Sequence, residues 1–467
     1  MTDVPTRPRP VPGSPRPYEF PAFERGTLAG GLNLITVHLP DRPLISATVV
    51  LRNGASDEPD EVGGSTVLAA RALTEGTERF DAVGLAEAAE RLGAELHAEA
   101  GWDAMSAGLE VPVERLEHGL DLLTEVVRRP VFPPSEVERL RDQRLADLRQ
   151  ARVDPARRVA EAFSSTVYAP TSPYSRPAGG TTETVGLLDT AAARAAYERG
   201  VDPARTTVIV GGDLSGLDVA ALLGPLVADW TASPGARPPA PVAATEALPR
   251  PRVRVVHRPG AVQSEIRIGH VGLPRKHADF HAVSVLSMIL GGLFNSRLNR
   301  KLREEKGYTY GARASFDFRR GAGPFVVAAP VRTDATAAAT RDALDEIAAL
   351  REGGVTEGEL RAAKDYLVGV FPFRFQTPGP VVGAIGDLVA RDLPDDELAR
   401  YRPAIEAVSV ADVRRVAEAH IDPERLAIVL VADADSVAAD MAAAGFTEID
   451  VLREQAGENG SPGDGTE

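Results

Sequence analysis

The chain has 467 residues and no cysteine, and its 52 basic and 67 acidic residues give a net charge of −15. This length favours two domains. The missing thiols exclude disulfides, thiolate metal ligands and a cysteine nucleophile, and they fit a reducing compartment, for which we expect the cytoplasm. The acidic balance argues against a nucleic acid or an anionic membrane as a partner.

The first half of the chain alternates between strand and helix patterns. Residues 1–22 are rich in proline and arginine and lack the apolar stretch of a secretory signal, so we expect a disordered leader. No run of about 18 apolar residues predicts a membrane span. β-rich runs predict a strand pair within 32–51 and further strands over 105–111 and 208–214. Helical spacing predicts helices over 65–73, 82–93, 113–129 and 133–152.

The second half repeats the first. Asp202-Pro203 and Asp213 recur as Asp422-Pro423 and Asp433, in both cases 220 residues later. Two further landmarks recur at offsets of 218 and 221, which indicates a tandem duplication of a unit of about 200 residues. We predict an α+β fold of two homologous tandem domains, each a mostly antiparallel sheet with helices on one face. The expected divisions are the leader 1–22, a domain 23–230, a proline-rich linker 231–251, a domain 252–446 and a polar tail 447–467.

Common catalytic motifs are absent from the sequence. Neither HExxH nor HxxEH occurs, and there is no GxSxG, P-loop or dinucleotide-binding pattern. His277 and His281 have the i, i+4 spacing that puts two imidazoles on one helix face, but they follow Pro274 and no third ligand is apparent in the sequence. We therefore interpret them as a polar helix start and predict no metal site in this chain.

The segments GLNLITVHLPDRPLISATVVLRNGASDEP and GGSTVLAARALTEGT resemble the first half of the M16, or insulinase-like, zinc peptidases, in the bacterial and mitochondrial-processing-peptidase branch. That family carries an inverted zinc motif, HxxEH, on a helix before a Gly-Thr pair. A gap-free alignment puts Val67 and Arg71 at its two histidines, Ala70 at its glutamate base and Asp147 at its third ligand. The resemblance thus implies a degenerate site without zinc, in which Arg71 and Asp147 form an ion pair.

The segment FNSRLNRKLREEKGYTYGARASF resembles the M16 segment that places an arginine and a tyrosine seven residues apart, here Arg303 and Tyr310. Gly307 is expected to end the helix. Alternation over 308–318 predicts a strand in which Tyr308 and Tyr310 share a face. A guanidinium and a phenol that converge there are two donors, which suits a peptide carbonyl or an oxyanion. Without the resemblance, a solvated ion pair of Arg303 with Glu304 or Glu305 and a core position for Tyr310 are favoured.

The resemblance spans residues 23–435 and implies one half of a clamshell. It implies a non-catalytic, substrate-binding subunit of a heterodimeric peptidase, inactive alone, whose partner carries HxxEH and the Zn²⁺. The short LGGLFNS segment replaces the long glycine-rich loop of the mitochondrial subunit, which disfavours presequence processing. The alternatives are a structural or assembly protein of this fold and, with less support, a self-sufficient peptidase with an unrecognised site.

Overall fold

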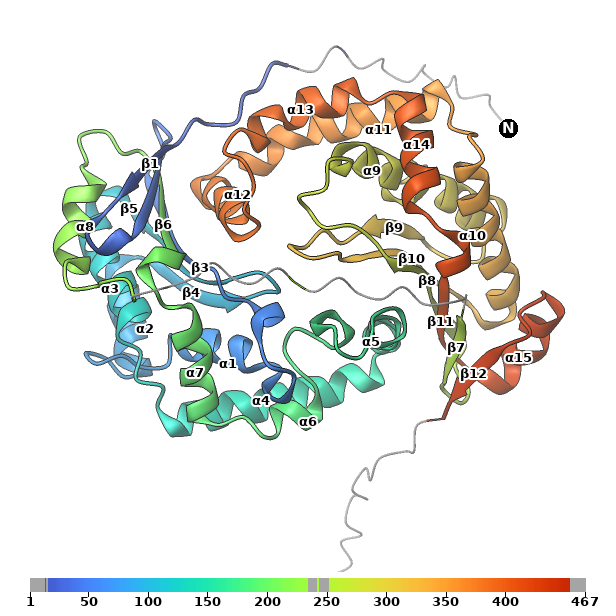
Figure 1. Cartoon of the computed structure of the whole chain (residues 1–467), viewed down its shortest axis with the longest axis horizontal. Helices are drawn as coiled ribbons and strands as arrows, with labels where there is room; N and C mark the ends of the chain where they lie inside the picture. Colours follow the sequence, from blue (N-terminus) through green and yellow to red (C-terminus); the bar gives the residue numbers. More distant parts are fainter. Residues whose placement is uncertain (1–12, 14–15, 234–241, 243–251, 454–467) are drawn as a thin grey trace, which may run out of the picture.

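The computed structural model describes residues 13, 16–233, 242 and 252–453. Most of the predicted linker, 231–251, lies outside the described residues, as do most of the leader and the end of the tail. Figure 1 shows two groups of strands and helices that face each other, one from each half of the chain.

The first half forms a six-stranded sheet in the order β1-β2-β6-β3-β5-β4. Its strands are β1 (Glu24–Thr27), β2 (Asn33–His38), β3 (Leu44–Leu51), β4 (Glu95–Ala100), β5 (Met105–Pro112) and β6 (Thr206–Gly212). Its helices are α1 (Ser65–Ala72), α2 (Ala82–Leu92), α3 (Leu116–Arg128), α4 (Pro134–Val153), α5 (Pro155–Val167), α6 (Thr182–Val185), α7 (Thr190–Gly200) and α8 (Val219–Val227).

The second half forms a six-stranded sheet in the order β12-β7-β11-β8-β10-β9. Its strands are β7 (Arg252–His257), β8 (Gln263–Val271), β9 (Arg313–Phe316), β10 (Pro324–Arg332), β11 (Ala427–Ala432) and β12 (Ile449–Leu452). Its helices are α9 (Phe280–Ser287), α10 (Thr336–Arg351), α11 (Glu357–Val370), α12 (Pro378–Ala390), α13 (Glu397–Ala407), α14 (Val410–His420) and α15 (Ala434–Ala443), with π-helical segments η7 (Met288–Gly292) and η8 (Asn299–Glu305).

The two sheets confirm the predicted duplication. Strands β2 to β6 and β7 to β11 occupy equivalent positions, and only the sixth strand differs: β1 precedes the repeated strands of the first half, whereas β12 follows those of the second. The equivalence extends to single hydrogen bonds. The Nδ1 atom of His38 accepts from the backbone N–H of Leu214, and 219 residues later His257 accepts from Ala434 in the same way.

Alternation along β3 explains how one strand serves two faces. Ala47, Val49 and Leu51 pack into the core formed with helices of the first half. Ser46 and Thr48 point to the opposite face of the sheet, toward the second half. Each sheet therefore has a face covered by its own helices, as predicted, and an inner face turned toward the other half.

Each inner face is covered in part by a helix of the other half (Figure 1). Helix α12 of the second half packs Val382 and Ile385 against Ile35 and Ile209 of the first sheet. Helix α5 of the first half packs Phe163 in a cluster with Val429 of the second sheet. This exchange buries apolar surface from both halves in shared cores, so neither half completes its packing alone.

The sheets are mostly antiparallel, as predicted, with parallel pairing only of β2 with β6, of β11 with β7 and of β12 with β7. Two details differ from the sequence-based expectations. Part of the expected leader is packed: Phe20 is buried against α12, and Arg402 donates to the backbone oxygens of Arg16 and Tyr18. Part of the expected tail is strand β12, which pairs with β7. Because both ends are mostly polar, their few apolar residues were not recognised as parts of the fold.

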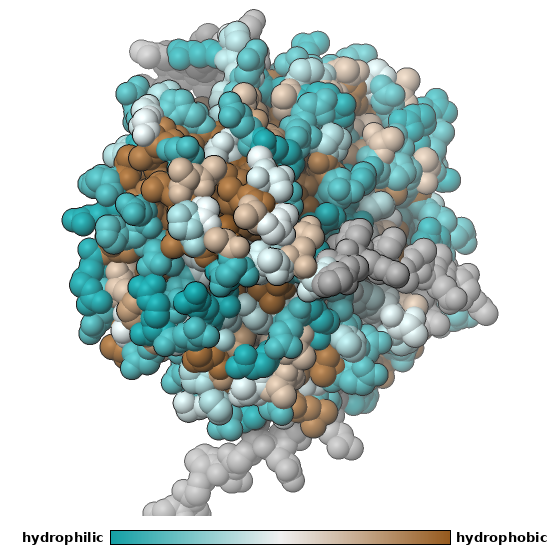
Figure 2. Space-filling model, turned by 60° about the vertical axis from the view of Figure 1, so that its left-hand side comes forward, coloured by the Kyte–Doolittle hydropathy of each residue, from teal (hydrophilic) through white to brown (hydrophobic). Residues whose placement is uncertain are grey.

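The face in Figure 2 mixes hydrophilic and hydrophobic residues, with hydrophobic ones gathered in its upper left part. Among residues 16–233 and 252–453, no helix combines the length and apolar character that crossing a membrane requires.

Candidate functional site

The four positions of the degenerate zinc motif lie on α1 and α4, which pack together. Ala70 is buried and Val67 is half-buried, and neither has a side chain that ligates a metal. Arg71 and Asp147 are each partly exposed, and the Nη1 atom of Arg71 lies 3.9 Å from Oδ2 of Asp147. The expected ion pair is therefore present, with a length that makes it a weak one.

A buried carboxylate holds the start of α1 in place. Glu58 accepts hydrogen bonds from the backbone N–H groups of Gly64 and Thr66, at 2.9 and 2.5 Å, and Arg176 lies 3.3 Å from it. Such an anion at a helix N-terminus satisfies amides that lack partners within the helix. Burial raises the pKa of Glu58, against the opposing effect of these hydrogen bonds and of Arg176. The helix α1, which carries the motif positions, is therefore held firmly at its start, although the metal-ligating side chains are absent.

The surroundings of Asp147 are cationic. Arg144, one turn before it on α4, donates from Nε to the backbone oxygen of Gly179 at 2.9 Å. Burial lowers the pKa of Arg144, and the nearby charge of Arg71 lowers it further. Two guanidinium groups beside one carboxylate oppose a divalent cation. These residues do not fit the zinc ion of the family.

The Arg/Tyr pair lies elsewhere, at the end of η8. The guanidinium of Arg303 stacks 3.7 Å over the ring of Phe294 and donates to its backbone oxygen at 3.0 Å and to Glu304 at 2.8 Å. As predicted, Gly307 ends the helical segment, with a φ of 63° and its N–H bonded to Arg303 O. Tyr310 is 95% exposed and Phe294 78% exposed. This edge of the molecule therefore presents two aromatic rings to solvent, beside a guanidinium that is only 18% exposed.

The predicted strand over 308–318 is wrong at both ends, because β9 spans only Arg313–Phe316. Strand β9 begins only at Arg313, because the hydroxyl of Thr309 bonds both the N–H and the carbonyl of Gly311 and so bends the chain. Tyr308 packs against the core while Tyr310 points outward, so the two rings do not share a face. Among the described residues, no hydrogen bond links Arg303 to Tyr310. The two residues are seven positions apart in the sequence, and their side chains are not joined in the structure.

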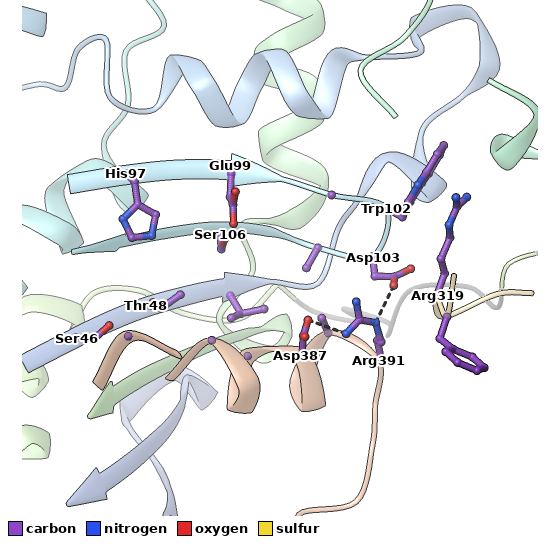
Figure 3. A pocket seen from close by; sticks show the side chains of 18 of the residues that line it. Ser46, Thr48, His97, Glu99, Trp102, Asp103, Ser106, Arg319, Asp387 and Arg391 are labelled. Carbon is purple, nitrogen blue, oxygen red and sulfur yellow. Dashed lines mark ion pairs between the residues drawn. The ribbon is translucent and has the colours of Figure 1, made fainter. Parts of the chain in front are cut away.

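A cavity of about 690 Å³ lies between the two halves. Figure 3 shows its lining: the inner face of β3, β4 and β5 on one side, with Thr48, His97, Glu99 and Ser106, and α12 on the other. Arg303 and Tyr310 are not among the lining residues. Strand β4 is the edge of the first sheet and pairs only with β5 among the described strands. Its free backbone edge can pair with an extended peptide.

Ion pairs close one end of this cavity and join the halves. Arg320 lies 2.6 Å from Asp57 and donates from its backbone N–H to Asp103 at 3.1 Å. Arg391, which follows α12, lies 3.4 Å from Asp103 and 2.7 Å from Asp387 (Figure 3). Burial raises the pKa of Asp103, opposed by the Arg320 N–H and by the guanidinium charges. These contacts fix the second half against the β4–β5 turn.

The cavity was not predicted from the sequence. Its signal was the alternation in ELHAEA, which makes one face of a strand from Glu95, His97 and Glu99. No sequence pattern indicates that α12 lines this cavity, because that depends on which of the two sheets the helix covers.

The histidine pair does not share a helix. Helix α9 begins at Phe280, so His277 lies in the preceding turn and only His281 is helical. His277 instead approaches Asp279 and, from α14, His420, a grouping that could hold a metal ion. Asp279 is already engaged, at 2.6 Å from His420 and 2.7 Å from Arg415, and Arg415 lowers its pKa. We interpret this group as an ion-pair cluster that ties α9 to α14.

Comparison with known proteins gives consistent matches along the chain. The family "Insulinase (Peptidase family M16)" matches residues 34–181, and "Peptidase M16 inactive domain" matches residues 188–367. An uncharacterized zinc protease of Mycobacterium tuberculosis is 27% identical over 411 residues, which cover 88% of this chain and 93% of that one. A protein of Helicobacter pylori described as a non-peptidase homolog is 23% identical over 393 residues, 82% of this chain and 88% of its own.

Two solved structures share the fold. A peptidase M16 inactive domain from Pseudomonas fluorescens has a TM-score of 0.79 and 24% identity, covering 88% of this chain and 98% of its own. A protease from Helicobacter pylori has a TM-score of 0.81 and 20% identity, covering 88% and 99%. With two tandem domains of this architecture and both family matches in order along the chain, the protein belongs to the M16, insulinase-like, peptidase family.

Proposed function

We propose that this chain is the non-catalytic, peptide-binding subunit of a heterodimeric M16 zinc peptidase, inactive alone, with an M16-like partner that carries HxxEH and the zinc ion. The observation that carries the proposal is the contrast between two sites. The zinc-motif positions hold Val67, Ala70 and an Arg71–Asp147 pair, whereas Arg303 is present and partly buried and Tyr310 is exposed. In this proposal the complex works in the cytoplasm.

The role of the Arg/Tyr pair follows from its chemistry. Both side chains donate hydrogen bonds, and Tyr310 has no hydrogen bond to another described residue that a substrate would have to displace. Arg303 keeps a defined position through its stacking on Phe294. Two donors that meet one carbonyl oxygen stabilise the negative charge that develops on it during hydrolysis. A bound peptide would bring the two groups together by accepting from both.

The cavity and the edge strand β4 support a peptide as the substrate. An extended chain added beside β4 gains backbone hydrogen bonds that do not depend on its sequence. The cavity beneath then receives side chains from one face of that chain. Its size restricts the site to an unfolded segment, since a folded domain cannot enter a space of about 690 Å³.

Coexpression with an M16-like chain that carries HxxEH tests the proposal. We expect a heterodimer by size-exclusion chromatography, zinc in the partner by elemental analysis, and peptide hydrolysis by the complex only. A homodimer of this chain with stoichiometric zinc and EDTA-sensitive cleavage would refute the proposal. A stable heterodimer whose activity is independent of this chain's residues would instead identify a structural protein.

A further inference from the structure

We propose that a pocket between α3 and α8, in the first half of the chain, binds a free α-amino acid through its ammonium and carboxylate groups. The pocket has a volume of about 360 Å³ and shares no lining residue with the cavity between the halves. Figure 1 shows both helices at the left of the molecule, away from the second half. The proposal is therefore independent of the proposed function, which concerns other residues.

The pocket has one charged side and one apolar side. Helix α3 forms the charged side, to which the loop before α2 adds Arg79. The end of α8 forms the apolar side with Pro225, Leu226 and Ala228. A volume of this size lies at the lower end of the range in which proteins hold small molecules, so the ligand is a small one.

The first observation is a buried carboxylate in the charged side. The side chain of Glu125 is only 3% exposed, and its Oε1 atom accepts the backbone N–H of Arg79 at 3.1 Å. Within the described part of the chain, no hydrogen bond reaches its Oε2 atom. The Nη1 atom of Arg129 lies 3.9 Å from Oε2, beyond hydrogen-bond distance. An ammonium group of a ligand supplies the donor that this buried oxygen lacks.

The second observation is that the arginines of the pocket are not equally engaged. Arg128 is only 10% exposed, donates to the backbone oxygen of Leu226 at 2.6 Å and pairs with Asp229 at 2.9 Å. Arg129 is 44% exposed, and its 3.9 Å contact with Glu125 is its only ion pair among the described residues. The guanidinium of Arg129 is therefore free to bind the carboxylate of a ligand through two parallel hydrogen bonds.

The short distance between these two groups identifies the class of ligand. An α-amino acid carries its ammonium and its carboxylate on neighbouring bonds of one carbon. With the ammonium on Glu125 and the carboxylate on Arg129, it replaces one weak ion pair by two sets of charge-assisted hydrogen bonds. A ligand with a single charge satisfies only one of the two residues.

The helix ends and the apolar side define the ligand further. Helices α3 and α8 end at Arg128 and Val227, beside the pocket, and the partial negative charge of a helix C-terminus favours an ammonium group. The apolar side of the pocket suits an aliphatic side chain. Leucine is therefore the probe. Free amino acids of this kind are what complete hydrolysis of peptides releases.

Calorimetric titration of the full chain tests the proposal without a partner subunit. The probes are leucine, leucinamide, which lacks the carboxylate, and N-acetylleucine, which lacks the ammonium. We expect leucine to bind with a dissociation constant of about 1 mM or lower. Each of the other two compounds should bind about tenfold more weakly, because each loses one charge-assisted interaction.

Two charge variants assign each group of the ligand to its residue. Glu125→Gln keeps an acceptor for the Arg79 N–H, and it should remove the preference for leucine over N-acetylleucine. Arg129→Gln should remove the preference for leucine over leucinamide. The controls are Glu117→Gln, the same charge change at an exposed position of α3, and Arg115→Gln, just before that helix.

A third variant tests the position of the site without changing a buried group. Ala228→Phe places a ring in the pocket from an exposed position and should abolish leucine binding. Its control is Ala220→Phe, at an exposed position of α8 outside the pocket, which should bind leucine normally. Thermal melts of all variants establish that they fold.

Failure of leucine to bind at millimolar concentration would overturn the proposal. Equal affinity for the three compounds would also overturn it, since the site would then not recognise a zwitterion. Normal leucine binding by Ala228→Phe would place any binding elsewhere on the molecule. None of these results bears on the proposed function, which the activity of the reconstituted heterodimer decides.

Discussion

Replacing Tyr310 by Phe separates a role in catalysis from a role in folding. The phenol is 95% exposed and makes no hydrogen bond to a described residue, so its removal should change the free energy of unfolding by less than about 0.5 kcal/mol. If the hydroxyl stabilises an oxyanion, turnover by the heterodimer should fall by about 10²- to 10³-fold, or about 3–4 kcal/mol of activation free energy. No structural role accounts for both results together.

Arg303→Ala is the companion change. It removes a guanidinium stacked on Phe294 and an ion pair with the half-exposed Glu304, each worth up to about 1 kcal/mol. We expect a modest loss of stability and a loss of turnover similar to that of Tyr310→Phe. The double variant should be less than additive, because both donors serve one oxygen.

Steady-state kinetics of the reconstituted heterodimer measure these effects. A loss in kcat indicates donors that act in the transition state, whereas a rise in KM alone indicates that they bind the ground state equally. Arg300→Ala on η8 and Tyr366→Phe on α11 are matched controls at exposed positions and should retain full turnover. Full activity in both Arg303→Ala and Tyr310→Phe would refute the reasoning and favour a structural protein.

Three further changes test the packing and the electrostatics. Ile385→Ala empties the shared core under α12 and should lower the free energy of unfolding by about 2–5 kcal/mol in urea denaturation; a negligible change would contradict the exchange of helices between halves. Asp147→Asn should shift a thermal melt very little, since its pair with Arg71 is long and exposed, and a large loss would show that the pair is part of the core.

His270 is buried, holds its proton toward Val271 O and accepts from the Asp422 N–H, and burial lowers its pKa. Its contribution to stability is complete above the unfolded pKa of about 6.5 and is lost as the pH falls toward the lower folded value. His270→Gln should therefore weaken the loss of stability below pH 6.5; an unchanged pH profile would contradict this.

The sequence by itself determined what local pattern and internal comparison can reach. The repeat of Asp202-Pro203 at Asp422-Pro423 predicted two homologous units, and periodicity located helices such as α2, which ends at Gly93 as expected. The absence of histidine at positions 67 and 71 follows from residue identity alone. The Arg71–Asp147 pair was also predictable, because the resemblance places both positions on adjoining helices.

Only the tertiary structure decided which surfaces meet. The cover of the first sheet by α12 and of the second by α5 depends on contacts between residues that are distant along the chain, and local periodicity carries no information on which sheet a helix covers. The cavity between the halves exists only because those segments come together. Even over a few residues, the side-chain hydrogen bonds of Thr309 outweighed the strand alternation and turned Tyr310 outward.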